Sequence, residues 1–247
     1  HLPSDFFTRA RELFNSLPPL QPIDHNKGAE SAKAFEQHLS RLSIQYSPES
    51  IVQATAGRKP ILILGASGAR WWQKISKVQQ IVATELLQGL TSAIDPHNSY
   101  LLIGRPKDAG ITTVLSAAVI ERNRASNPSD KVSLISATVQ ADQTTRSFTP
   151  GLTHVLPLRG GLFTVPHQLV DYVVERDGLV IFIGGGTFVR DAILVARERG
   201  VAFALMRGPE GASTDKSAMF DQSRIFSDLS ELLMMIRKMK PELLSPS

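Results

Sequence analysis

Short, uninterrupted apolar runs recur along the chain from residue 59 onward. The first is Ile-Leu-Ile-Leu at 61–64, and the most apolar is Leu-Val-Ile-Phe-Ile at 179–183. Runs of this length suit strands that are buried on both faces, as in parallel sheets. On this basis we predict strands at 61–64, 100–103, 132–139, 154–158, 179–183 and 201–206.

Amphipathic stretches separate these apolar runs. The longest has apolar residues at 75, 78, 82, 86, 90 and 94, which places them on one stripe of a helix. Similar stripes lie at 111–118, 169–174, 189–196 and 229–236. Strands that alternate with helices need crossover connections, which are right-handed in a parallel sheet. The sequence therefore predicts an α/β fold with a doubly wound, Rossmann-like parallel sheet.

The first 58 residues have a different pattern. Two amphipathic runs with helical spacing, 6–17 and 32–42, are separated by prolines and a polar loop, and a third short run, 48–56, ends at Gly57. We interpret residues 1–58 as an N-terminal helical arm or cap and residues 59–247 as the sheet domain. Because the chain starts with His1 rather than Met, we expect a longer protein, and a linker to a fused domain is the alternative for this arm.

The composition excludes several classes of protein. The chain has 247 residues, of which 42% are hydrophobic and 20% charged, as in ordinary globular proteins. Its net charge of +4 is scattered and only 6% of residues are aromatic, so we expect no nucleic-acid partner. It has no cysteine and no apolar run of membrane-spanning length. We therefore expect a cytoplasmic protein without disulfides or a transmembrane segment.

Three glycine-bearing segments lie where a predicted strand passes into a predicted helix. In an open parallel sheet, ligands bind outside the carboxyl ends of the strands. Glycines there let backbone N–H groups approach a ligand, and helix N-termini favour an anion. We therefore predict a site for a phosphate-bearing ligand. Its candidate residues are Gly65, Ala66, Ser67, Gly68 and Arg70; Gly104, Arg105, Gly110, Ile111, Thr112 and Thr113; and Gly184, Gly185, Gly186, Thr187 and Arg190.

The common phosphate-binding and metal-binding motifs are absent. The segment 65–70 does not extend to G-x-G-x-x-G, and no G-x-x-x-x-G-K-[ST] occurs, which disfavours a dehydrogenase and a P-loop NTPase. The six histidines lack ligand spacing, so we expect neither a metal nor a cofactor. A simpler interpretation is that the glycines only serve tight turns. The polar loop 208–215, on the same edge, is a candidate lid.

The glycine segments also resemble a known superfamily. Residues 176–187, with an acidic-small pair, an apolar strand and Gly-Gly-Gly-Thr opening a helix, look like the SLOG superfamily. It groups LOG-type phosphoribohydrolases, Smf DNA-processing proteins and nucleotide-sensor domains. Residues 102–104 with 110–111 resemble its second glycine motif, and 64–67 its first loop. The resemblance covers roughly residues 59–215 and implies a Rossmann-like nucleotide-binding domain.

Two departures from this pattern bear on activity. Hydrolytic members carry Glu in G-T-x-x-E and an Arg about nine residues before the Asp of the acidic-small pair, whereas this chain has Arg190 and Gln168 there. An arginine cannot activate water or stabilise an oxocarbenium-like centre. The resemblance then implies a sensor that binds an NAD-derived nucleotide such as ADP-ribose and signals to an effector or a partner subunit, as part of a homo-oligomer.

Two other functions stay open. An enzyme that cleaves or transfers at an N-glycosidic bond would need a carboxylate, and Asp191 and Glu175 are the candidates. A scaffold domain with a vestigial pocket would bind no ligand.

Overall fold

Seven parallel strands form one sheet in this protein. The computed structural model describes residues 48–65, 72–73, 75–104, 110–139, 152–158, 165–208, 211–217 and 219–246. The strand order is β4-β3-β2-β1-β5-β6-β7, and every neighbouring pair is parallel. The predicted α/β fold is therefore confirmed. The strands are β1 (Lys59–Gly65), β2 (Ser99–Ile103), β3 (Leu134–Val139), β4 (His154–Leu158), β5 (Leu179–Ile183), β6 (Ala202–Met206) and β7 (Ile225–Phe226).

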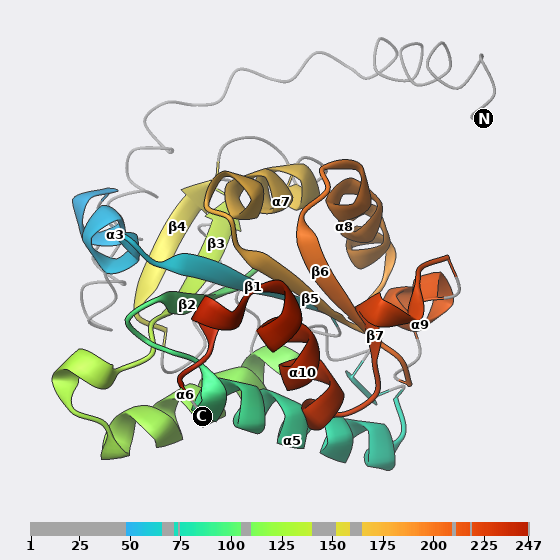
Figure 1. Cartoon of the computed structure of the whole chain (residues 1–247), viewed down its shortest axis with the longest axis horizontal. Coiled ribbons are helices and arrows are strands. Elements are labelled where there is room, and N and C mark those ends of the chain that lie inside the picture. The colour runs from blue at the N-terminus through green and yellow to red at the C-terminus, as the bar shows by residue number, and fades with distance from the viewer. Residues whose placement is uncertain are drawn as a thin grey trace, which may run out of the picture.

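Helices cover both faces of the sheet (Figure 1). On one face lie α7 (Val165–Glu175) and α8 (Thr187–Glu198). On the other lie α5 (Lys77–Ala93), α6 (Ile111–Ala125) and α10 (Leu229–Met239). No helix in the described ranges is both long and apolar enough to cross a membrane. The shorter elements are α3 (Pro48–Thr55), α9 (Ala212–Ser217) and 3-10 turns at Pro128–Asp130, Gln222–Arg224 and Pro241–Leu243.

The core consists of two apolar layers, one on each face of the sheet. In β1, Ile61 and Ile63 pack toward α5 and α6, whereas Leu62 and Leu64 pack toward α7 and α8. Successive side chains of a strand point to opposite faces, so a strand covered on both sides must be apolar at every position. All five residues of β5 are buried for the same reason. This double coverage explains the continuous apolar runs in the sequence.

The chain winds outward from the middle of the sheet twice. From β1 it proceeds through β2 and β3 to β4, and from β5, the other neighbour of β1, it proceeds through β6 to β7. The strand order therefore reverses between β1 and β5. We call the side where the strands end the carboxyl edge and the side where they start the amino edge. A reversal of this kind opens a ligand crevice at the carboxyl edge of parallel sheets.

Two elements are not predicted by the sequence pattern. β7 has only two residues and α9 only six, so neither is long enough to show a period. Of the predicted helical arm, α3 alone falls within the described residues, and its Ile51 is buried. Residues 1–47 lie outside them.

Candidate functional site: the carboxyl edge of the sheet

The ends of β1 and β5 meet the start of α6 at the carboxyl edge. Gly65, the last residue of β1, pairs with Ile183, the last residue of β5. A Cβ atom at Gly65 would lie 2.0 Å from the Ile183 carbonyl oxygen and 3.0 Å from Cδ1 of Ile111. Glycine is therefore required at position 65. The close approach brings Gly65 and Ile111, from two of the predicted glycine segments, next to Ile183, the residue that precedes the third segment.

Two consecutive glycines with positive φ form the turn from β5 into α8. Gly184 and Gly185 have φ values of 61° and 92°. A Cβ atom at Gly185 would lie 2.4 Å from Cγ2 of Val189, which is buried in the first turn of α8. Both the left-handed backbone and this packing demand glycine. Gly186 is the N-cap of α8 and provides no side-chain hydrogen bond to the first turn.

The connection from β2 to α6 also has a glycine after the strand and a glycine as the helix cap. Gly104 follows β2, and its carbonyl oxygen accepts a hydrogen bond from Ser136 Oγ on β3 at 3.0 Å. Gly110 caps α6, again without a side-chain hydrogen bond. The side chains of Ile111 and Thr112 are buried, whereas that of Thr113 is exposed. Ile111 therefore belongs to the apolar core beneath the site.

These two helices differ from others in how their first turns are capped. The first N–H groups of a helix have no partner within it. In α5 the Ser76 side chain accepts from the Gln79 N–H, and in α10 the Asp228 side chain accepts from the Glu231 N–H. In α6 and α8 the cap residue is a glycine, which has no side chain that could accept such a bond. Uncapped first turns on either side of the switch point favour an anion.

Of the other predicted residues, some lie near the glycine turns and the rest lie outside the described ranges. Thr187 and Arg190 are exposed in the first turn of α8, at the same end of the sheet as the glycines. Asp191 is exposed at the next position. Five predicted residues lie outside the described ranges: Ala66, Ser67, Gly68, Arg70 and Arg105.

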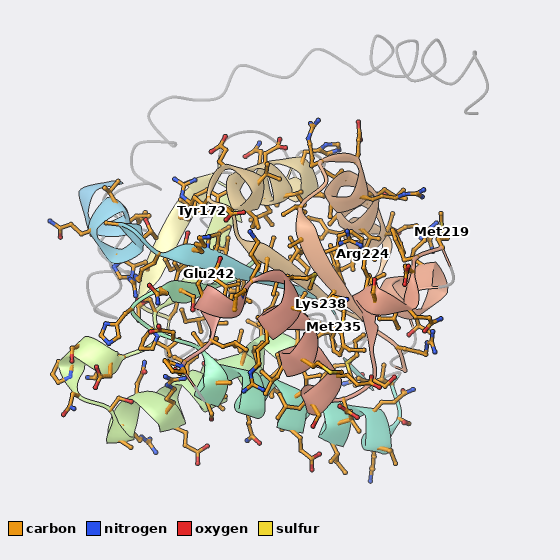
Figure 2. The ribbon with its side chains drawn as sticks, in the orientation of Figure 1. Tyr172, Met219, Arg224, Met235, Lys238 and Glu242 are labelled. Carbon is orange, nitrogen blue, oxygen red and sulfur yellow. The ribbon has the colours of Figure 1, made fainter. Side chains whose placement is uncertain are left out.

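The second carboxylate candidate lies at the other edge. Glu175 is the last residue of α7, beside Arg176, and lines a groove with Arg58 at the start of β1. It does not face the glycine turns, because α7 leads into β5 and so ends at the amino edge. Figure 2 shows Tyr172 of α7 near the start of β1, at the opposite end of the view from Met219, which follows α9. The described residues contain no group of three or more side chains suited to a metal ion.

A segment that the sequence motifs did not assign to the site contacts its glycine turn. Gly211 forms a parallel bridge with Gly185. The hydroxyl of Ser213, which is fully buried, lies 2.6 Å from the Gly184 nitrogen. The one available signal was the polar, glycine-bearing composition of the loop 208–215. The residues that it contacts could not be predicted.

No protein-family model and no curated protein matches this chain. Among solved structures, the molybdenum cofactor binding protein from the phototrophic bacterium Rippkaea orientalis is similar, with a TM-score of 0.53 and 14% identity over 74% of this chain and 98% of that one. The Moco carrier protein from Chlamydomonas reinhardtii has a TM-score of 0.52 and 13% identity over 75% and 99%. These similarities show the fold, a Rossmann-like α/β sheet. Membership of the superfamily stays a prediction.

Proposed function

We propose that this protein binds a phosphate-bearing nucleotide at the carboxyl edge of its sheet and acts as a sensor module. The observation that carries the proposal is the pair of first turns, in α6 and α8, that flank the switch point and lack side-chain caps. Backbone N–H groups at such turns bind phosphate oxygens well. An NAD-derived nucleotide such as ADP-ribose fits the resemblance of the glycine segments to nucleotide-sensor domains.

The similar structures support a small-molecule ligand but identify neither the ligand nor its site. Two of them are named for binding or carrying the molybdenum cofactor. Because these proteins share the fold of this chain, the molybdenum cofactor belongs in the ligand panel. The effector or partner subunit that would receive the signal, and a homo-oligomeric state, belong to the same proposal.

Hydrolysis is the second candidate function. Arg190 occupies the Glu position of the hydrolytic motif, and Glu175 lies at the amino edge. Asp191 is then the one carboxylate among these candidates that lies near the glycine turns. Because Asp191 is exposed on α8 near the glycine turns, its role in hydrolysis can be tested directly. A hydrolase would release base or ribose phosphate, and Asp191→Asn would abolish that release.

The test is a thermal-shift and calorimetry panel of ADP-ribose, NAD, AMP, cyclic dinucleotides and molybdenum cofactor, followed by chromatography of the mixtures. A ligand specific for the native state raises Tm in proportion to the logarithm of its concentration. We expect ADP-ribose to do so and to be recovered intact. Recovery of products instead would favour the hydrolase, and no shift with any ligand would overturn the nucleotide proposal.

The matched variants are Arg190→Glu and Arg237→Glu. Both reverse one exposed charge, the first beside the glycine turn and the second in the last turn of α10. A glutamate in the first turn of a helix is favourable, so Arg190→Glu should keep its stability. Loss of a charge-assisted hydrogen bond should raise its Kd for ADP-ribose roughly tenfold or more. Equal affinity of both variants would remove Arg190 from the site.

A further inference from the structure

Residues 211–213, which we call the latch, lie against the turn between β5 and α8. Gly211 has a φ of 126° and forms a parallel bridge with Gly185. A Cβ atom at Gly211 would lie 2.4 Å from the Gly185 carbonyl oxygen and 2.9 Å from its nitrogen. The latch therefore touches the backbone of the proposed site with no side chain between them.

Ser213 joins the latch to two strands. Its hydroxyl donates to the Met206 carbonyl oxygen at the end of β6, at 2.9 Å, and accepts from the Gly184 N–H at the end of β5, at 2.6 Å. Its own N–H donates to the Gly184 carbonyl oxygen at 3.2 Å. One hydroxyl can serve as donor and acceptor at once. Ser213 thus satisfies backbone groups of two neighbouring strands and is itself fully buried.

This geometry limits what a ligand can contact. The Gly184 N–H is already bonded to Ser213, so the donors for an anion lie further along, in the first turn of α8. The position of that turn depends on the left-handed residues Gly184 and Gly185, which the latch holds from one side. An alanine at position 213 would leave the Gly184 N–H and the Met206 carbonyl without this partner.

We infer that Ser213 is a positioning residue of the proposed nucleotide site: it fixes the Gly184–Gly185 turn and so presents the first turn of α8 to the phosphate. The inference rests on the proposed function. Within the loop 208–215 that the sequence suggests as a lid, residues 211–213 are bonded to the glycine turn, so this part of the loop acts as a fixed wall of the site. The carbonyl oxygen of Gly208 accepts a further bond from Gln79 of α5, which ties the same region to the other side of the switch point.

The structure offers a close control for Ser213. Ser99, at the start of β2, is also fully buried, and its single hydroxyl proton is shared between the carbonyl oxygens of Asp95 at 2.9 Å and Leu243 at 3.1 Å. It lies at the amino edge. Ser99→Ala should lower Tm by about 2–4 °C, because it removes one donated hydrogen bond of a buried hydroxyl. Ser213→Ala should lower Tm by about 3–6 °C, because it also leaves the Gly184 N–H without this partner. Since both variants lose stability, an effect on the site that Ser213→Ala alone shows reflects the position of Ser213.

The experiment measures two properties of both variants. Calorimetry with ADP-ribose should show about a tenfold rise in Kd for Ser213→Ala and less than about a twofold change for Ser99→Ala. Amide hydrogen exchange without ligand, followed by NMR, reports the Arg190 N–H, which donates to the Gly186 carbonyl oxygen at 3.0 Å in the first bond of α8. Its exchange should accelerate about tenfold in Ser213→Ala alone.

Each outcome decides the inference. Faster exchange of Arg190 together with weaker binding supports it. If the Arg190 N–H exchanges at the same rate in Ser213→Ala as in the wild-type protein, the inference is overturned, whether or not a ligand is found. If the wild-type protein binds ADP-ribose and Ser213→Ala binds it equally well, the inference is also overturned. Failure of the wild-type protein to bind ADP-ribose counts against the proposed ligand, and the exchange rate then still decides whether Ser213 sets the turn.

Discussion

The two edges of the sheet use opposite means to hold their loops. At the carboxyl edge, Gly184 and Gly185 with positive φ form the turn after β5, and backbone-to-backbone contacts join Gly185 to Gly211 and Gly65 of β1 to Ile183 of β5. At the amino edge, charged and aromatic side chains link the elements: Lys59 Nζ lies 2.6 Å from Asp177 Oδ2 and 2.7 Å from Glu242 Oε1, and Lys240 bonds the second oxygen of Asp177. Figure 2 shows Glu242 close to β1 at this end.

The charges at the amino edge already satisfy one another. Both oxygens of Asp177 are bonded to lysines, and Arg199 pairs with Asp171 at 2.9 Å. Helices α7, α8 and α10 end at this edge, and basic residues near a helix C-terminus are stabilising without any ligand. A concentration of charge is therefore a poor guide to the site of this protein. The carboxyl edge, where glycines cap the first turns of α6 and α8, is the better candidate.

The largest expected loss of stability comes from adding a methyl group at Gly65, where β1 and β5 approach each other closely. Gly65→Ala places a Cβ atom 2.0 Å from the Ile183 carbonyl oxygen, and neither strand can move without disturbing the sheet. We expect a loss of about 3 kcal/mol in the free energy of unfolding, measured in urea. Gly104→Ala is the control, since its nearest neighbour, Leu64 Cδ2, would lie at 3.4 Å. Equal losses would show that the contact at Gly65 relaxes freely.

An intermediate effect is expected from the aromatic pair at the amino edge. The hydroxyls of Tyr100 and Tyr172 lie 2.9 Å apart, and Tyr100 is fully buried beneath α7. Burial, with this hydrogen bond second, raises the pKa of the Tyr100 hydroxyl. Tyr100→Phe removes one buried hydrogen bond and should cost about 1 kcal/mol in chemical denaturation. The affinity of Tyr100→Phe for nucleotide should equal that of the wild-type protein. A clear loss of binding would contradict the assignment of the ligand site to the carboxyl edge alone.

The smallest expected effect concerns Asp177, whose side chain is 65% exposed. Lys240 and then Lys59 lower the pKa of its carboxyl group. Asp177→Asn keeps a residue that tolerates the φ of 53° and removes the charge. At pH 7 and low salt it should cost less than about 1 kcal/mol.

The difference in the free energy of unfolding between the wild-type protein and Asp177→Asn should change with pH in one direction. Because the folded pKa is depressed, the stabilisation is present above the unfolded value of about 3.9 and is lost as the pH falls through the folded value. The free energies of unfolding of the two proteins, measured in urea, should therefore become equal in strong acid and in 1 M salt. A difference that persists in acid would assign the effect to backbone strain instead of the ion pairs.

The contacts that join distant segments could not be predicted. Ser213 bonds Gly184, 29 positions earlier, and Lys59 bonds Asp177 over 118 positions. Serine, lysine and aspartate are common on loops and helix ends, and nothing in their local pattern marks these three. β7 was missed for a related reason, since two residues show no period and its pairing with β6 depends on the turn before it.

The sequence by itself determined most of the helices and strands, the parallel sheet and the strand ends at which glycines cluster. It could do so because double-sided burial requires continuous apolar runs and helices require a 3.6-residue period, which are local properties. Only the tertiary structure decided which strand ends meet, that Gly65 and Ile183 form the switch point, and that Ser213 bonds Gly184. Those depend on the order of strands in the sheet, and strand order is set by packing among residues far apart in the chain.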